Sequence, residues 1–417
     1  MQAIIRIFSS LQIPNYRLYF IGQIISLSGT WMQRVAQSWL VLELTGSGTT
    51  LGVVSALQFL PVLLLGPMGG VLADRYDKRR VLFATQAAPA ALAGILGVLV
   101  ATDVVEVWMV YALALALGLV QVVDSPTRQT FIHEMVGPDH LTNAVSLNSV
   151  VVNVARVIGP SFAGALIVTV GLAPCFFING LSYGAVLIAL ALMNPGRLMR
   201  SGVQSRRPGQ LREGFRYVQK TPEVLVPLLM MATVGTLAYE FQVVMPLLAR
   251  FTFGGDAGTY ATMSALMGAG AVVGGLATAA AGRKPATSLA WTAITFGSIQ
   301  LLTSMAPTLT ITYGMLIVLG ATSIRFLALG NATLQLAADP AMRGRVMALW
   351  AVAFLGSTPV GGPIVGWVGE HVGPRFALGL GGAATLASGV LAYRALAKIE
   401  ARNGRSHSPG IPPPKPA

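Results

Sequence analysis

Few side chains of this protein could do chemistry, and the main candidates stand alone inside long apolar stretches. Only 10% of its 417 residues are charged. Glu240 is the one carboxylate well inside such a stretch, and Arg34, Arg156 and Arg325 are the basic residues in equivalent positions. A carboxyl group in a low-dielectric environment can gain and lose a proton, because burial disfavours its charged form. Glu240 is therefore our candidate proton carrier, and a static ion pair with one of these arginines is the alternative.

Asp124 is the competing carboxylate for a proton-coupling role. It lies near the end of its apolar stretch and four residues before Arg128. A carboxylate at the membrane face has basic loop residues within reach. We therefore expect Asp124 to form a structural link with Lys78 or Arg79 instead of carrying a proton.

Uncharged polar side chains accompany the charged ones at helical spacing. Such groups are costly in hydrocarbon, so they indicate a functional cavity. They are Gln33 and Gln37, one turn apart beside Arg34; Asn148, eight residues before Arg156 on the same helix face; and Tyr239 and Gln242, which flank Glu240.

The remaining residues indicate no metal, redox or nucleotide chemistry. The single cysteine, Cys175, cannot form an intramolecular disulfide, and the four histidines show no metal-ligand spacing. The sequence contains no Ser/His/Asp set and no phosphate-binding Gly-Lys-Ser/Thr loop. We therefore expect no metal and no cofactor, and the pattern argues against an enzyme and against an ATP-driven pump.

The apolar stretches have the length of membrane-spanning helices. The chain is 54% hydrophobic with a mean hydropathy of +0.68, and a helix needs about 20 residues to cross a ~30 Å hydrocarbon layer. Continuous apolar runs lack the alternation of barrel strands. We predict an all-α membrane protein with twelve transmembrane helices, at residues 16–44, 51–72, 81–101, 106–128, 141–168, 173–193, 223–250, 258–281, 287–305, 310–333, 345–369 and 375–396.

Basic residues predict the orientation of these spans. An even number of spans places both termini on one side, and most of the 28 Lys and Arg residues fall on that side. Basic loops collect in the cytoplasm, so we expect both termini on the cytoplasmic side of a bacterial-type inner membrane. The positive balance then reflects topology and contact with membrane lipids, and no nucleic acid partner is expected.

A long polar break divides six spans from six, and similar residues recur on both sides of it. Gly69-Gly70 matches Gly274-Gly275, and Gly159-Pro160 matches Gly362-Pro363. We therefore predict two parallel six-helix repeats. The boundaries are an N-terminal bundle at 1–193, a cytoplasmic central loop at 194–222, a C-terminal bundle at 223–396 and a disordered tail at 397–417.

The loop after the second span carries a family resemblance. Residues Gly70-Val71-Leu72-Ala73-Asp74-Arg75-Tyr76-Asp77-Lys78-Arg79 resemble the G-x-x-x-D-R-x-G-R-R signature of the major facilitator superfamily, with Asp77 where the family usually has glycine. The resemblance covers roughly residues 10–400 and implies the major facilitator fold. It implies a gating role for Gly70, Asp74, Arg75, Lys78, Arg79 and Arg128.

Residues 155–164 resemble the G-x-x-x-G-P-x-x-G-G motif of antiporters in that superfamily, with alanine in place of two glycines. Small residues let helices approach closely, and a proline bends a helix by removing a backbone donor. Gly159, Pro160 and Gly164 are therefore candidates for a sliding or gating contact, and ordinary tight packing is the alternative.

Residues 124–129 and 141–144 resemble the exporter branch of the superfamily, which includes enterobactin exporters. The resemblance implies a substrate cavity lined by the helices that carry Gln33, Arg34, Gln37, Asn148, Arg156, Tyr239, Gln242 and Arg325. Three arginines against one glutamate favour anionic or zwitterionic substrates. The aromatic residues and methionines of the spans would equally suit lipophilic substrates. The sequence leaves this choice open.

We predict a proton-driven exporter of small amphipathic or lipophilic molecules, drug-like or siderophore-like, that works as a monomer by alternating access. Its expected partners are a small-molecule substrate, protons and membrane lipids. A passive facilitator or importer on the same fold is the alternative, followed by a membrane receptor that does not transport.

Overall fold

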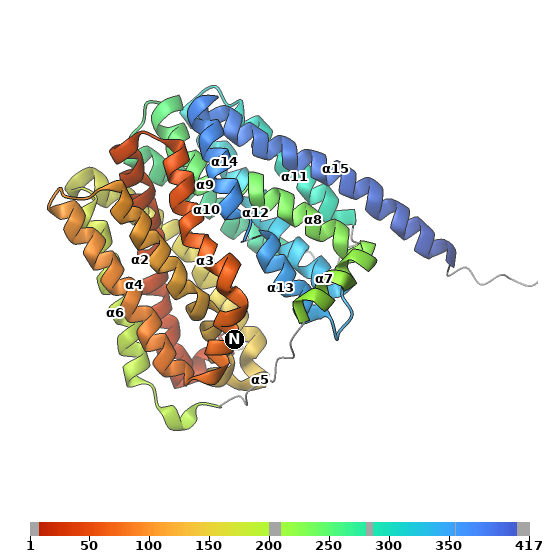
Figure 1. Ribbon diagram of the computed structural model, residues 1–417, viewed down its shortest axis with the longest axis horizontal. Coiled ribbons are helices and arrows are strands. Elements are labelled where there is room, and N and C mark those ends of the chain that lie inside the picture. Colours follow the sequence, from red (N-terminus) through yellow and green to blue (C-terminus); the bar gives the residue numbers. More distant parts are fainter. Residues whose placement is uncertain (1–7, 200–209, 281–286, 355, 407–417) are drawn as a thin grey trace, which may run out of the picture.

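The computed structural model describes residues 8–199, 210–280, 287–354 and 356–406. These residues form helices and turns, and no strand occurs among them. The helices gather in two groups (Figure 1).

Residues 9–192 form the N-terminal bundle. Its elements are η1 (Ser9–Gln12), α2 (Pro14–Thr45), α3 (Gly48–Arg75), α4 (Lys78–Ala101), α5 (Val107–Val170) and α6 (Ala173–Leu192). Side-chain caps fix two of the helix starts. The Ser47 hydroxyl accepts a hydrogen bond from the Thr50 N–H at the start of α3, and the Asp77 carboxylate accepts one from the Arg80 N–H at the start of α4. The departure from the signature loop at Asp77 thus provides a helix cap.

Helix α5 folds back on itself within 64 residues. Its one non-helical residue is Gly137, with φ +69° and Pro138 directly after it. Glycine adopts this left-handed conformation without the steric penalty of a side chain. The predicted loop between residues 128 and 141 is therefore helical, and the reversal is confined to Gly137.

Residues 222–406 form the C-terminal bundle. Its elements are α8 (Pro222–Leu237), α9 (Phe241–Leu247), η3 (Leu248–Thr252), α10 (Ala257–Ala280), α11 (Thr287–Ser304), α12 (Leu309–Ala337), α13 (Arg343–Phe354), α14 (Thr358–His371) and α15 (Pro374–Ser406). Two predicted spans are interrupted here, one between α8 and α9 and the other between α13 and α14.

The predicted central loop contains helical segments. They are η2 (Pro195–Arg197) and α7 (Gln210–Lys220). The Arg345 Nη1 and Glu213 Oε1 atoms are 2.8 Å apart, and the Tyr217 hydroxyl accepts a hydrogen bond from the Asp339 N–H. These bonds attach α7 to the C-terminal bundle.

The predicted disordered tail begins too early in the chain. Helix α15 continues to Ser406, so residues 397–406 are helical. The first four residues of this stretch include alanine, lysine and glutamate, which are strong helix formers. Residues 407–417 lie outside the described residues.

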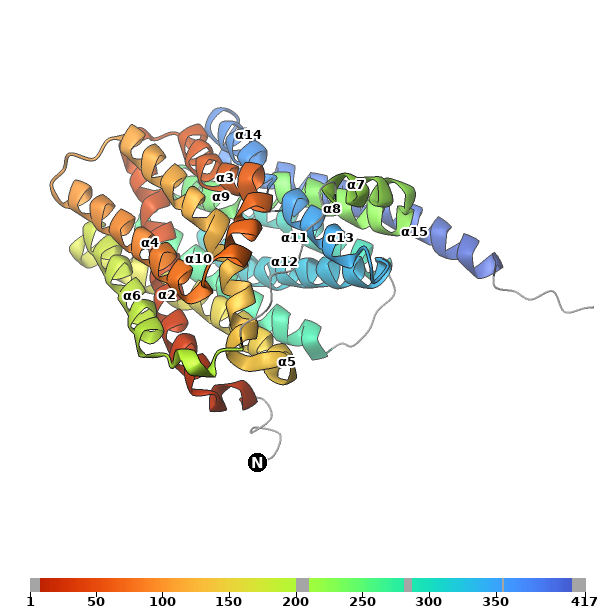
Figure 2. The same ribbon diagram turned by 60° about the horizontal axis from the view of Figure 1, so that its bottom comes forward.

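The two bundles meet at one end and diverge towards the other (Figures 1 and 2). We call the end that carries Arg75, Arg128 and α7 the basic end. The opposite end, which carries the turns at Gly46 and Gly373, is the far end. Helix α3 packs against α14 across the boundary, and α5 packs against α10.

Glycines line the contact between α3 and α14. A Cβ atom on Gly52 would collide with the carbonyl group of Gly362, and one on Gly48 would lie 2.5 Å from the carbonyl oxygen of Gly366. The two backbones therefore touch with no side chain between them. We call these four residues the glycine seam.

A polar contact closes the far end beside the glycine seam. The Glu370 Oε2 atom, near the end of α14, accepts hydrogen bonds from the Ser47 hydroxyl (2.7 Å), the Thr49 N–H (2.9 Å) and the Thr49 hydroxyl (2.6 Å). The Arg250 guanidinium donates to the Leu42 carbonyl at 3.0 Å. Each bond joins one bundle to the other.

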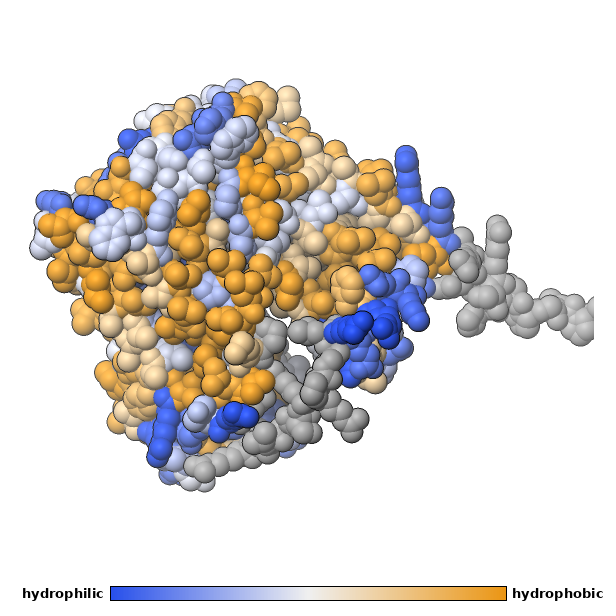
Figure 3. All heavy atoms as spheres, in the orientation of Figure 1, coloured by the Kyte–Doolittle hydropathy of each residue, from blue (hydrophilic) through white to orange (hydrophobic). Residues whose placement is uncertain are grey.

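Hydrophobic side chains cover much of the visible surface (Figure 3). Leu181, for example, is 78% exposed. Large exposed apolar areas are unfavourable in water but suit a lipid environment. Within the described residues, nine helical segments are long and apolar enough to cross a membrane. This surface fits a multi-pass membrane protein.

Candidate functional site

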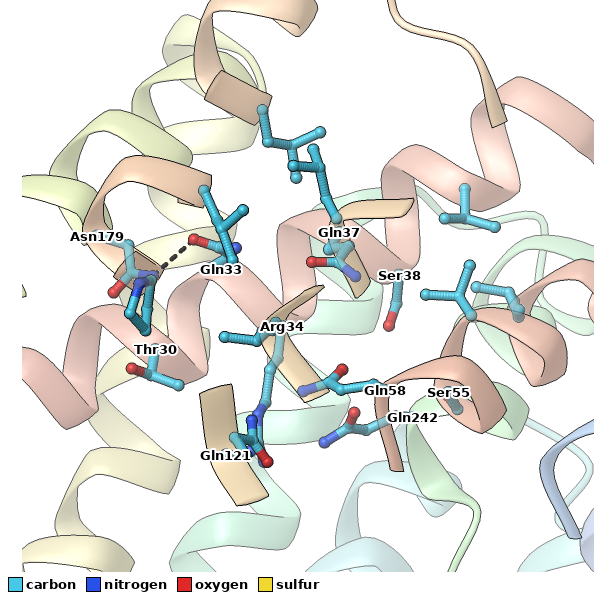
Figure 4. Close-up of a pocket in the computed structure, with 18 of the residues that line it drawn as sticks. Thr30, Gln33, Arg34, Gln37, Ser38, Ser55, Gln58, Gln121, Asn179 and Gln242 are labelled. Carbon is cyan, nitrogen blue, oxygen red and sulfur yellow. Dashed lines mark hydrogen bonds between the residues drawn. The ribbon is translucent and has the colours of Figure 1, made fainter. Parts of the chain in front are cut away.

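A polar cavity of about 50 Å³ lies among the helices of the N-terminal bundle and reaches α9 of the C-terminal bundle. This volume holds water but not a drug-sized ligand. Figure 4 shows its labelled polar residues pointing towards a common space. The polar lining consists of Thr30, Gln33, Arg34, Gln37, Ser38, Ser55, Gln58, Gln121, Asn179, Tyr183 and Gln242.

Four of the predicted cavity residues meet in this space, namely Gln33, Arg34, Gln37 and Gln242. The first three share one face of α2, because residues three and four apart are neighbours on a helix. The Asn179 side-chain amide donates to the Gln33 Oε1 atom at 2.6 Å, which joins α6 to α2 (Figure 4).

Two guanidinium groups lie over the ring of Trp31, next to this cavity. The Cζ atom of Arg34 is 4.6 Å from the ring centroid, and that of Arg156 is 5.1 Å from it. Arg34 and Trp31 are both on α2, whereas Arg156 comes from α5. Contacts of this kind contribute about 0.5–2 kcal/mol each, depending on desolvation. Among the side chains that the structure describes, no carboxylate forms an ion pair with either arginine.

Gly159 allows α5 to reach Trp31. A Cβ atom on Gly159 would lie 2.5 Å from the Trp31 Cβ atom and 2.6 Å from the Ser28 carbonyl oxygen. Arg156 is three residues earlier and on the same helix face. The segment at residues 155–164, which resembles the antiporter motif, thus brings Arg156 to the indole ring of Trp31.

The other two residues of that segment have different surroundings. Pro160 is buried inside α5, and the helix continues past it. Gly164 faces the other bundle, where its Cβ would lie 2.8 Å from the Ala261 Cβ atom on α10. The segment therefore contacts α2 of its own bundle and α10 of the other bundle.

Glu240 lies in the break between α8 and α9 and is 5% exposed. Its Oε1 atom has no hydrogen-bond partner in the described part of the chain. The side chain of Thr358, at the start of α14, interacts with the carboxyl group. The Gln300 amide supports the break by donating to the Ala238 carbonyl at 3.3 Å. No described lysine or arginine pairs with Glu240, so the static ion pair is not present in this conformation.

Asp124 is bound within the N-terminal bundle. Its Oδ2 atom is 2.8 Å from the Arg128 Nη2 atom. Its Oδ1 atom accepts hydrogen bonds from the Thr85 hydroxyl at 2.8 Å and the Gln86 amide at 2.7 Å. The expected link from Asp124 to Lys78 or Arg79 is therefore wrong.

Lys78 and Arg79 find other partners because α5 continues beyond Arg128. This extension brings the Glu134 carboxylate within 2.7 Å of the Lys78 ammonium, and the two side chains are 7% and 9% exposed. The Arg79 guanidinium donates instead to the carbonyl groups of Leu190 and Ala191 on α6.

The signature loop ends α3 at the basic end. Gly70 is buried, although its neighbour Gly69 is the residue that would collide with α5 if it carried a Cβ, at the Val122 carbonyl. Arg75 is exposed. The side chain of Asp74 lies outside the described part of the structure.

Four predicted cavity residues do not line the cavity, namely Asn148, Arg156, Tyr239 and Arg325. Tyr239 donates its hydroxyl to the Ser323 carbonyl at 2.7 Å, inside an aromatic cluster of the C-terminal bundle. Arg325 is exposed on α12, and Asn148 is half-buried on α5, two turns before Arg156. Arg156 itself reaches the edge of the site through Trp31.

Sequence reasoning missed Gln58, Gln121 and Asn179. Each is an amide in an otherwise apolar run of the sequence. An uncharged polar group isolated in a span has the same physical meaning as a charged one, since its hydrogen bonds must be satisfied without water. The isolation of these amides in apolar runs therefore indicates cavity residues.

Sequence comparisons connect the chain to transport proteins. A family model described as a transmembrane secretion effector matches residues 5–415. The staphyloferrin A transporter of Staphylococcus aureus is 29% identical over 178 residues, which are 42% of this chain and 45% of that protein. The multidrug efflux pump Tap of Mycolicibacterium fortuitum is 24% identical over 359 residues, 82% of this chain and 87% of that protein. The match to the staphyloferrin A transporter thus spans less than half of that protein's length.

Solved structures with the same arrangement of helices are also transporters. A bacterial homolog of the human lysosomal transporter Spinster, in an inward-facing and unoccupied conformation, gives a TM-score of 0.69 at 16% identity. The match covers 92% of this chain and 98% of that chain. At this identity the likeness shows the fold alone.

Proposed function

The chain belongs to the transmembrane secretion effector family of the major facilitator superfamily, and we propose that it is a secondary active exporter that exchanges protons for small amphipathic or lipophilic molecules. Its family makes it a multi-pass membrane transporter and not an enzyme. The names of the multidrug efflux pump Tap and the staphyloferrin A transporter support drug-like and siderophore-like substrates.

The proposed architecture has twelve spans in two parallel six-helix repeats. The 64-residue α5 is long enough for two spans of about 20 residues. Helices α2 and α11 would add two more to the nine apolar segments. We propose the bundle boundaries at 1–193 and 223–396 as part of this architecture. We also propose that the protein works as a monomer.

The proposed orientation places the basic end in the cytoplasm, because basic loops resist translocation. The far end, closed by the glycine seam and Glu370, would then face the outside. On this proposal the conformation is inward-facing. Transport would require the far end to open while the basic ends of the two bundles approach each other.

The burial of Glu240 with no cation partner among the described residues is the observation that carries the proton-coupling proposal. A charged carboxylate is costly in such a place, whereas a neutral carboxylic acid is tolerated. The group lies where two interrupted helices face each other, so their movement would change its access to water. Proton binding and substrate binding would then favour different conformations, which is what antiport requires.

The test is gradient-driven flux in proteoliposomes. The substrate would be the compound that gives the largest thermal shift in a screen of amphipathic molecules. Glu240→Gln keeps the size of the side chain but cannot titrate, so it should abolish flux driven by a pH gradient while substrate exchange continues. Asp124→Asn tests the competing carboxylate, and Glu43→Gln is a control at an exposed carboxylate.

Three outcomes are separable on one preparation. Loss of gradient-driven flux in a stable Glu240→Gln protein supports the carrier role. Loss of thermal stability together with all flux would instead indicate a structural role. Full gradient-driven flux would remove Glu240 as the carrier and favour Asp124 or a passive facilitator.

A further inference from the structure

Arg34 and Arg156 form a pair of positive charges that proton exchange does not explain. Both Cζ atoms lie close to the centroid of the Trp31 ring, so they are at most about 10 Å apart, the sum of the two distances. The two groups come from different helices, and Gly159 is the close contact that brings α5 to α2 at this point. Like charges held this near to each other repel.

The described residues provide no hydrogen-bond acceptor for these two guanidinium groups. Neither guanidinium makes a hydrogen bond to any residue that the structure describes, and the Nε atom of Arg156 is buried without a partner. A guanidinium has five N–H donors, and buried donors without acceptors are unfavourable. The indole ring attracts both cations but accepts no conventional hydrogen bond from them. A ligand that brings negative charge and acceptor oxygens would satisfy both requirements.

The surroundings indicate what the rest of this ligand is like. The adjoining cavity combines the amides of Gln33 and Gln121 with the apolar side chains of Leu92, Leu96 and Leu113. Arg34 lines this cavity, and its volume of about 50 Å³ is too small for a whole drug-sized molecule, so at most a head group would enter it. Planar carboxylates match the fork of a guanidinium in two parallel hydrogen bonds.

We propose that Arg34 and Arg156 bind the carboxylate head group of the transported molecule beside Trp31. This deepens and rests on the proposed exporter function, since it makes the substrates amphipathic organic anions instead of neutral or cationic drugs. A lipid phosphate would offer similar chemistry to a guanidinium, and the experiment separates the two sources.

The experiment measures binding of three probes that differ only in their head group. Pyrenebutyrate, pyrenebutanol and pyrenebutylamine share one apolar body and carry a carboxylate, an alcohol and an amine. They are titrated into purified protein in phosphatidylcholine nanodiscs, without a pH gradient. Pyrenebutyrate should bind about tenfold or more tightly than the alcohol, and Arg34→Gln and Arg156→Gln should each remove most of that difference. Pyrenebutanol affinity should change by less than about twofold.

Two controls separate a ligand site from a structural role. Arg375 also lies over an aromatic ring, that of Phe253 at 5.6 Å, but at the far end. Arg375→Gln should leave pyrenebutyrate binding unchanged. The melting temperature of ligand-free Arg34→Gln protein should change little, since the lost contact with Trp31 and the relieved repulsion between the two arginines offset each other, whereas a structural role predicts a large fall.

The proposal is overturned if both arginine variants bind pyrenebutyrate within twofold of the unmodified protein, or if the amine binds more tightly than the carboxylate. It is also overturned if phosphatidylglycerol in the nanodiscs displaces the probe completely, because a lipid phosphate would then be the occupant. Binding needs no gradient, so failure of proton coupling in Glu240→Gln would leave this result unaffected.

Discussion

Removing the charge of Glu370 should loosen the far end of the molecule. One oxygen of this carboxylate receives three hydrogen bonds from Ser47 and Thr49, at the first turn of a helix in the other bundle. Separation of the bundles at this end would break all three. The interaction therefore favours the closed far end over the open one.

The size of the effect follows from the exposure of the site. Glu370 is exposed, and exposed ionic contacts contribute only about 0–1 kcal/mol. An anion at a helix N-terminus adds about 0.3–1 kcal/mol. We expect Glu370→Gln, which keeps one acceptor oxygen, to weaken the closed state by about 1 kcal/mol, and Glu370→Ala by about 2 kcal/mol. The ratio of molecules with a closed far end to molecules with an open far end should therefore fall about fivefold in Glu370→Gln and about 30-fold in Glu370→Ala.

Spin-label distances across the far end measure this ratio. Asp103 and Pro307 are exposed residues in far-end loops of the two bundles, and Cys175 is buried, so labels at two introduced cysteines would report the separation. Glu43→Gln is the matched control, because that carboxylate accepts its hydrogen bond from Trp39 on its own helix. Distance distributions that are the same for Glu370→Gln, Glu370→Ala and the unmodified protein would refute the reasoning.

Three further predictions concern stability, packing and topology. Glu134→Gln leaves the buried Lys78 ammonium without its counter-charge and should lower the free energy of unfolding by about 3 kcal/mol. The double variant with Lys78→Met should recover part of this loss, as measured by thermal unfolding. No recovery in the double variant would contradict the prediction. Gly159→Ala places a methyl group against the backbone of α2, so it should lower the free energy of unfolding by about 1–3 kcal/mol and weaken pyrenebutyrate binding. Gly184→Ala is the control, because a Cβ atom at Gly184 meets open space, and it should change neither stability nor binding. A protease or fluorophore reporter at Gln204 should be reached only from the cytoplasm, and labelling from outside would reverse the proposed orientation.

Much of the helical framework could be predicted from the sequence because lipid imposes one requirement on every span. A stretch of about 20 apolar residues has to satisfy its backbone hydrogen bonds internally, and this makes it a helix. Local exceptions were not predictable in the same way. Helix α5 extends past residue 128 because capping and packing, not hydropathy, decide where a helix ends near the membrane face. The same extension explains why Glu134, and not Asp124, meets Lys78.

The candidate site was predictable only in part. Gln33, Arg34 and Gln37 share a helix face, and helical periodicity alone places them together. Asn179 joins them through tertiary packing of α6 on α2, which no local pattern encodes. Arg325 shows the opposite case, since an arginine in an apolar run is a candidate for burial but the rotation of α12 leaves it exposed. Sequence identifies which polar groups are costly, and packing decides which of them meet.

The glycine seam offers a way to capture the opposite state of the transport cycle. Backbone touches backbone at Gly52 and Gly362, so a single added methyl group acts as a wedge in one conformation only. The added methyl group would destabilise the conformation with a closed far end by about 1–3 kcal/mol, and it would not affect the conformation in which the bundles have separated there. A Gly52→Ala protein should therefore populate the form with an open far end, which is outward-open in the proposed orientation, without any inhibitor or antibody. Cryo-electron microscopy of that variant would show the half of the cycle in which the basic ends meet.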